Sequence, residues 1–188
     1  MSRWNRKQLV LDASIATGSS DQMYNPTGDI AGDRNRDCLQ AVWEEEHIAV
    51  FNNELRVEWR EHASPSAIAW LQRMAQKSRI IVEEGNTFSE LLGPACACQS
   101  TEGEKTAIEK DFHLIRSALA TGQLIVSNET RFPRYVAGAC VSVPKLLELH
   151  YGNPVLEGEV CRLWIKAGAE KEANRRIDQW VVNHCANA

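Results

Sequence analysis

Residues 111–129 read DFHLIRSALATGQLIVSNE, and this stretch decides the fold class because a helix pattern is followed at once by a strand pattern. Apolar residues at helical spacing after Asp111 form one face: Leu114, Ile115 and Ala118. The helix is expected to end at Gly122, and Leu124–Val126 is a short apolar run typical of a buried strand. Asp111 lies on the apolar face, where a carboxylate is costly, and Glu129 follows the strand.

Working outward, the same two patterns alternate along the chain. Strands are expected at 8–11, 47–51, 80–82 and 124–126. Helices are expected at 34–45, from the caps at Asn52/Asn53 to about His62, from Ser64-Pro65 to Gln76, and after a capping box at Thr101/Glu104. Such alternation predicts an α/β fold, a three-layer α/β/α sandwich with a central parallel sheet.

Other segments carry weaker patterns. Residues 13–33 are rich in Gly, Ser and Asp and are expected to form a long loop, and 85–103 interrupt the alternation as an excursion. Helices are expected at 134–143, 143–150 and 169–183, while 155–160 fits no single pattern.

Composition favours one globular domain over residues 1–188, since 44% of the residues are apolar and 24% are charged. No apolar run is long enough to span a bilayer, and no signal-peptide core precedes a cleavage site. A cytoplasmic protein without a membrane partner is therefore expected. In that compartment its six cysteines are expected to remain thiols. The net charge of −4 argues against a generic polyanion-binding surface but leaves room for a local phosphate-binding groove.

Four carboxylates are placed where a parallel sheet would bring them together. Asp12 follows the first strand, Glu129 follows the strand at 124–126, and Asp111 and Glu58 lie among apolar neighbours on helices. The functional crevice of such sheets lies at the carboxyl ends of the strands. Converging carboxylates need protons or a cation, and oxygen ligands without His or Cys suit Mg²⁺ or Mn²⁺. Metal-assisted phosphodiester hydrolysis is the chemistry that fits.

At these residues the chain resembles the PIN-domain ribonucleases. The matching pieces are QLVLDAS at 8–14, Glu58-Trp59 on a helix, and DFHLIRSALATGQLIVSNETRF from Asp111 onward, which looks like the family's acid–helix–strand–Ser/Thr-x-acid segment. The resemblance covers about residues 8–135, so 85–103 and 140–188 lack a clear counterpart, and 140–188 is expected to be a divergent extension of the same domain.

The resemblance implies a PIN-like fold and a divalent-metal-dependent endoribonuclease that leaves a 5′-phosphate. It implies that Asp12, Glu58, Asp111 and Glu129 form the catalytic set, with Asp12, Asp111 and Glu129 holding Mg²⁺ or Mn²⁺. Ser127 is expected to support the ion or its water. The implied partners are an RNA substrate, a second copy of the chain and an antitoxin-like protein.

Some alternatives stay open. Glu54 competes with Glu58 for its position, and Glu129 stands where many members of the family have Asp. Arg131 replaces another Asp common in the family, so it either holds a substrate phosphate or pairs with Glu129 and silences the site. The alternative function is therefore a catalytically degenerate PIN-like module that binds RNA or protein, and a DNA substrate is not separated from RNA. His113, a lone helical histidine, is expected to face solvent.

Overall fold

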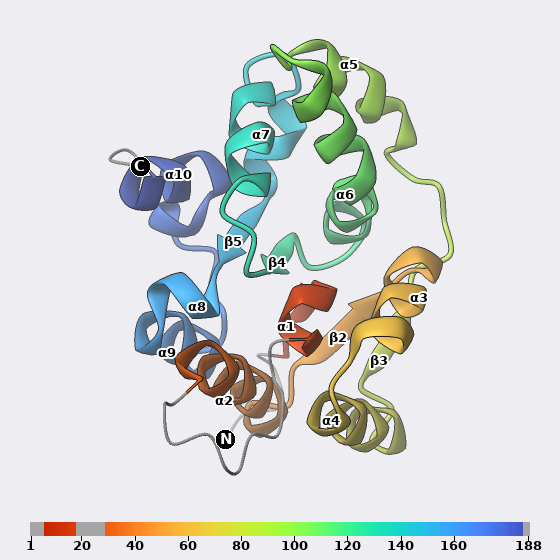
Figure 1. Ribbon diagram of the computed structural model, residues 1–188, viewed down its shortest axis with the longest axis vertical. Helices are drawn as coiled ribbons and strands as arrows, with labels where there is room; N and C mark the ends of the chain where they lie inside the picture. Colours follow the sequence, from red (N-terminus) through yellow and green to blue (C-terminus); the bar gives the residue numbers. More distant parts are fainter. Residues whose placement is uncertain (1–5, 18–28, 186–188) are drawn as a thin grey trace.

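The computed structural model describes residues 6–17 and 29–185, and its centre is a five-stranded parallel sheet (Figure 1). The strands are β1 (Gln8–Leu11), β2 (Ile48–Phe51), β3 (Ile80–Val82), β4 (Leu124–Val126) and β5 (His150–Gly152), in the spatial order β3-β2-β1-β4-β5. Every neighbouring pair is parallel. The predicted α/β class with a central parallel sheet is therefore confirmed.

Helices cover the sheet on both faces. They are α1 (Ala13–Thr17), α2 (Ile30–Glu44), α3 (Asn53–His62), α4 (Pro65–Gln76), α5 (Leu92–Ala97), α6 (Glu102–Ala120), α7 (Phe132–Ala139), α8 (Pro154–Glu157), α9 (Glu159–Lys166) and α10 (Ile177–Cys185). In Figure 1, α5, α6 and α7 lie above the strands, and α2, α4, α8 and α9 lie below them. This arrangement is the predicted three-layer sandwich.

The central strand β1 shows why this sequence forms such a sheet. Leu9, Val10 and Leu11 are each fully buried, because a strand covered on both faces needs apolar residues at successive positions. The strand order runs outward from β1 to β2 and β3 on one side and to β4 and β5 on the other. The carboxyl ends of β1 and β4 therefore flank the switch point at which open α/β sheets place their crevice.

The helix starts predicted from cap residues are confirmed. The side chains of Asn52 and Ser64 each accept a hydrogen bond from the first turn of α3 and α4, and Thr101 and Glu104 form the capping box of α6. Gly122 turns the chain from α6 into β4, since a Cβ there would lie 1.9 Å from the carbonyl oxygen of Gln8. No larger residue fits that approach.

The long loop predicted for 13–33 is wrong at both ends. The helix α1 begins directly after Asp12, and α2 begins at Ile30 rather than at residue 34. Residues 18–28 lie outside the described part of the chain. Ile15 and Ala16 are fully buried, so packing against the core stabilises a short helix whose sequence alone favours a loop. The excursion at 85–103 holds a short 3₁₀ helix, Ser89–Leu91, and then α5.

The C-terminal predictions needed more correction. The helix expected at 143–150 is a 3₁₀ turn, Pro144–Glu148, followed by the strand β5. The sequence of β5, His-Tyr-Gly, has no apolar run, and its Gly152 is needed because a Cβ would lie 2.9 Å from the Trp164 ring. The helix expected at 169–183 begins only at Ile177, after a 3₁₀ turn at Ala173–Arg175.

Within residues 6–17 and 29–185, no helix is both long enough and apolar enough to cross a bilayer.

All six cysteines carry free thiols, as expected from the sequence.

Candidate active site

A cavity of about 730 Å³ opens beyond the carboxyl ends of β1 and β4. All four predicted acids line it, although they come from four separate segments: Asp12, Glu58, Asp111 and Glu129. Arg131 also lines the cavity, together with Ser14, Lys110 and the first turn of α6. The structure thus brings together the acids that the sequence placed at one rim of the sheet.

Asp12 is held firmly at the base of this cavity. Its carboxylate oxygen Oδ2 accepts two hydrogen bonds of 2.6 Å, one from the hydroxyl of Ser14 and one from the hydroxyl of Ser127. Its exposed fraction is only 9%. Both bonds end on Oδ2, so Oδ1 accepts no hydrogen bond from any described residue and keeps its lone pairs for a ligand.

The segment after β4 is fixed by the same hydroxyl groups. The backbone N–H of Asn128 donates to the hydroxyl of Ser14 (3.1 Å), and that of Glu129 donates to the hydroxyl of Ser127 (3.0 Å). From β5, the Tyr151 hydroxyl donates to the carbonyl oxygen of Glu129 (2.5 Å). Burial raises the pKa of Tyr151 well above its ordinary value, which keeps this donor protonated. The backbone that carries Glu129 is therefore rigid.

Asp111 carries the clearest electrostatic signature in the cavity. Burial raises the pKa of its carboxyl group from 3.8 to about 6, and the charges of Asp12 and Glu129 push it in the same direction, while Lys110 and His113 oppose them. The acid on the apolar face of α6 is thus costly to ionise in this fold. Asp12 and Glu129 are close enough to act electrostatically on Asp111.

Glu58, not Glu54, faces the cavity. Its carboxylate oxygen lies 3.5 Å from Nε2 of His113, whereas Glu54 lies outside the cavity lining and pairs with Arg116 at 3.4 Å. His113 is buried, contrary to the expectation that it faces solvent, and its Nδ1 lies 3.0 Å from the carbonyl oxygen of Lys110 within α6.

Two positively charged side chains line the cavity without an ion-pair partner among the described residues. Neither Lys110 nor Arg131 forms an ion pair with any residue that the structure describes, and no such pair joins Arg131 to Glu129. The pairing that would silence the site is therefore absent from the described residues. Both side chains are available to an anionic ligand.

The donor set fits a hard divalent cation by chemistry, because the converging ligands are carboxylate oxygens. Over residues 6–17 and 29–185, however, no three or more Asp, Glu, His or Cys side chains already stand together as a ligand set. Holding an ion would bring together the carboxylates of Asp12, Asp111 and Glu129, which all line this one cavity.

Sequence reasoning missed several supporting residues. Ser14 holds Asp12 and the following loop, and Tyr151 holds Glu129, but hydroxyl groups carry no pattern that reveals such contacts. The contact of His113 with Glu58 was missed as well. In the sequence, His113 lies two residues after Asp111, and residues at this spacing do not share a helix face. The spacing therefore gave no reason to place His113 at the site.

Comparison of this chain with protein-family models, with curated proteins and with solved structures gives no match. The fold and the cavity define its class: a three-layer α/β protein with an acidic crevice at the switch point of a parallel sheet. The likeness to the PIN-domain ribonucleases rests on the motifs given above.

The raised pKa of Asp111 predicts how stability depends on pH without metal. A carboxyl group whose pKa is about 6 in the folded protein and 3.8 otherwise favours folding below about pH 4, and this contribution is lost as pH rises through 6. We expect Asp111→Asn, in EDTA, to unfold like wild type near pH 4 and to be more stable at pH 7.5 by about 1 kcal/mol, a value reduced for partial exposure to water. Thermal melts across this range measure the difference.

The control is Glu90→Gln, which removes an exposed carboxylate that does not line the cavity. Its melting temperature should follow that of wild type at every pH. A constant difference between Asp111→Asn and wild type from pH 4 to 7.5 would show that ionisation of Asp111 is not costly.

Proposed function

We propose that this protein is a divalent-metal-dependent endoribonuclease of the PIN-like kind, which hydrolyses phosphodiester bonds of RNA in the cytoplasm. The observation that carries the proposal is the convergence of Asp12, Glu58, Asp111 and Glu129 on one cavity at the carboxyl ends of β1 and β4. The unpaired cations Lys110 and Arg131 on the same cavity support a phosphate-bearing substrate.

Each residue has a role in this proposal. Asp12, Asp111 and Glu129 would hold Mg²⁺ or Mn²⁺, and Ser127 would keep the Asp12 carboxylate in place through its 2.6 Å hydrogen bond. When bound, the ion supplies Lewis-acid stabilisation of the charge that develops on the scissile phosphate. Arg131 would bind a phosphate oxygen of the RNA strand.

Glu58 lines the cavity, and its carboxylate lies 3.5 Å from Nε2 of His113. The carboxylate is partly exposed, at 30% of the side chain, so it can accept a proton from a water molecule in the cavity. The geometry therefore suits Glu58 as a base that acts beside the three metal-binding acids.

A second candidate function has its own support. The described residues hold no ready-made ligand set, and Asp12 already accepts two hydroxyl hydrogen bonds, which satisfy part of its charge without a metal. A PIN-like module that binds RNA or protein without cleaving it agrees with both facts. The nuclease proposal is preferred because Oδ1 of Asp12 has no partner among the described residues and Arg131 does not pair with Glu129.

The deciding experiment incubates the protein with single-stranded and structured RNA and with matched DNA, in Mn²⁺, Mg²⁺ or EDTA. The proposal expects RNA cleavage that leaves 5′-phosphates and stops in EDTA. Binding of RNA without cleavage in either metal would replace the nuclease proposal by the binding module, and cleavage of DNA alone would correct the substrate.

A further inference from the structure

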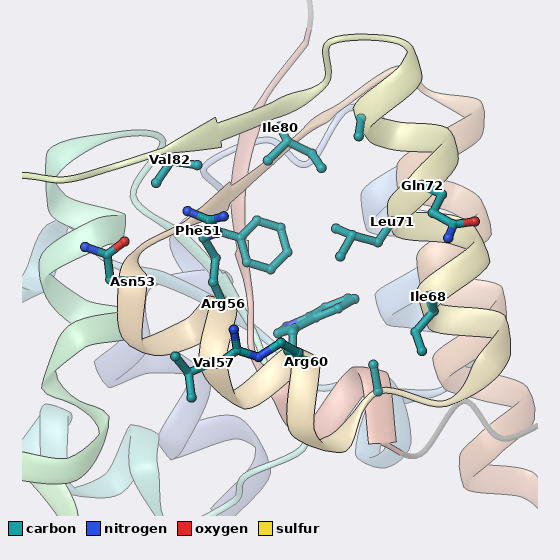
Figure 2. Close-up of a pocket in the computed structure, with 13 residues that line it drawn as sticks. Phe51, Asn53, Arg56, Val57, Arg60, Ile68, Leu71, Gln72, Ile80 and Val82 are labelled. Carbon is teal, nitrogen blue, oxygen red and sulfur yellow. The ribbon is translucent and has the colours of Figure 1, made fainter.

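A second cavity, of about 750 Å³, lies between α3, α4 and the edge strand β3 (Figure 2). Its lining has no residue in common with the acidic cavity. The residues that line it are Phe51, Asn53, Arg56, Val57, Trp59, Arg60, Ala63, Ile68, Leu71, Gln72, Ala75, Ile80 and Val82. We call this cavity the α3–α4 groove.

The groove is built from one face of each helix. On α3 the lining positions are 53, 56, 57, 59 and 60, and on α4 they are 68, 71, 72 and 75. The four α4 positions and the α3 positions 53, 56, 57 and 60 follow the i, i+3, i+4, i+7 spacing of a single helix face. Figure 2 shows α3 and α4 on either side of the groove, with the side chains of Phe51 and Leu71 in the space between them. Two helix faces separated by a groove can bind a third helix between them.

Most of the lining of the groove is apolar. Phe51 and Trp59 pack edge to face at 5.2 Å beneath it, and the edge strand β3 adds Ile80. Three wall residues are exposed: Val57 at 41%, Ile68 at 42% and Val82 at 36%. A contiguous exposed apolar surface of this kind marks an interaction site.

Charge in the groove has one sign. Arg56 and Arg60 are the charged residues of its lining, and neither guanidinium forms an ion pair or a hydrogen bond with a described residue. Figure 2 places both on the α3 side of the groove. The protein has a net charge of −4, so two unpaired arginines beside an apolar floor are a local exception. They complement a ligand that is apolar on one side and acidic at its flank.

We propose that the α3–α4 groove docks an acidic amphipathic helix of a partner protein. The apolar side of that helix would cover Val57, Ile68 and Leu71, and its Asp or Glu residues would lie opposite Arg56 and Arg60. This proposal does not depend on nuclease activity, because none of the groove residues belongs to the acidic cavity.

The probe is a displayed library of helical peptides with varied apolar residues at i, i+3, i+4 and i+7 and with flanking positions that are either Glu or Lys. Selection on the whole protein should enrich peptides with Glu flanks. The best of them is then synthesised, together with its Lys-flanked counterpart, and both are measured by fluorescence anisotropy. Absence of any binder, or enrichment without preference for Glu, would overturn the proposal.

Charge reversal tests the arginines. Arg56→Glu/Arg60→Glu should weaken the Glu-flanked peptide by about tenfold or more and strengthen the Lys-flanked one, because repulsion replaces attraction. The matched control Lys77→Glu/Lys171→Glu changes the net charge equally outside the groove and should leave affinity within about twofold. Equal losses in both variants would reduce the effect to net charge and reject the site.

Two further variants test the apolar wall. Ile68→Ser should weaken the peptide by about fivefold, while Val141→Ser, at a position 89% exposed outside the groove, should not change its affinity. Light scattering of wild type and Ile68→Ser tests whether the groove instead binds a second copy of the chain. If wild type is a dimer that Ile68→Ser dissociates, the groove belongs to a second copy of the chain and the proposal of an acidic partner is wrong.

Discussion

Asp111→Asn should lose more than about a hundredfold of the Mn²⁺-dependent RNA cleavage and yet melt at a higher temperature than the wild type in EDTA at pH 7.5. Loss of a residue that merely supports a metal ligand costs about 10–100-fold, so loss of the ligand itself is expected to cost more. The variant also removes the burial cost that raises the pKa of the Asp111 carboxyl to about 6. Activity and stability therefore move in opposite directions, and misfolding cannot explain the loss.

The other cavity residues give a graded series. Asp12→Asn should be as inactive as Asp111→Asn but should not gain stability, because its carboxylate accepts two hydroxyl hydrogen bonds that are stronger to a charged acceptor. Ser127→Ala removes one of those bonds and should lose about 10–100-fold of the activity. Cleavage rates and thermal melts on the same preparations provide both readouts.

Glu58 and Glu54 form a matched pair on one helix. Glu58 lines the cavity and Glu54 pairs with Arg116 outside it, so Glu58→Gln should slow cleavage at least about tenfold and Glu54→Gln by less than about twofold. Equal effects would remove Glu58 from the catalytic set. If Asp111→Asn keeps wild-type cleavage, the proposed function itself is wrong.

Fold and candidate site could be predicted from the sequence where the signal is local. The apolar runs at β1 and β4, the caps Asn52 and Ser64, and the capping box at Thr101 each specify a structure through neighbouring residues. Because parallel strands bring their carboxyl ends to one edge, the positions of Asp12 and Glu129 in sequence were enough to place them together.

Prediction failed where distant contacts decide the structure. The strand β5 has the sequence His-Tyr-Gly, which looks like a turn, and it forms a strand because β4 supplies its hydrogen-bonding partner. In the same way α1 depends on the burial of Ile15, and His113 is buried beside Glu58, which lies on a different helix. Patterns within a short window carry no information about such partners.

The C-terminal region illustrates this point, because a buried ion pair organises it. Arg175 donates to the Glu157 carboxylate, and their side chains are only 5% and 1% exposed. The other carboxylate oxygen accepts from the indole N–H of Trp180 and from the backbone N–H of Asn153, both at 2.8 Å. The Arg175 guanidinium also lies 4.7 Å from the centre of the Trp164 ring. One carboxylate thus joins α8, the turn before α10, and α10 itself.

Arg175→Met should therefore lower the free energy of unfolding by about 3–5 kcal/mol, since it leaves the Glu157 carboxylate buried without its cation. That is a large share of the roughly 5–15 kcal/mol that stabilises a typical domain. Urea unfolding followed by tryptophan fluorescence measures the change. The matched surface control is Arg162→Met, whose pair with Glu159 is 29% and 59% exposed, and its loss should change the free energy of unfolding little.

The double variant Glu157→Gln/Arg175→Met separates two contributions to the free energy of unfolding: the stabilisation by the ion pair and the cost of a lone buried charge. The neutral amide that replaces the Glu157 carboxylate could still accept from Trp180 and Asn153 through its oxygen, so the double variant should recover more than about half of the loss seen in Arg175→Met. Recovery would show that the unpaired carboxylate, and not lost packing of the arginine, causes the instability. A double variant as unstable as Arg175→Met would instead assign the effect to the packing of Arg175 on Trp164.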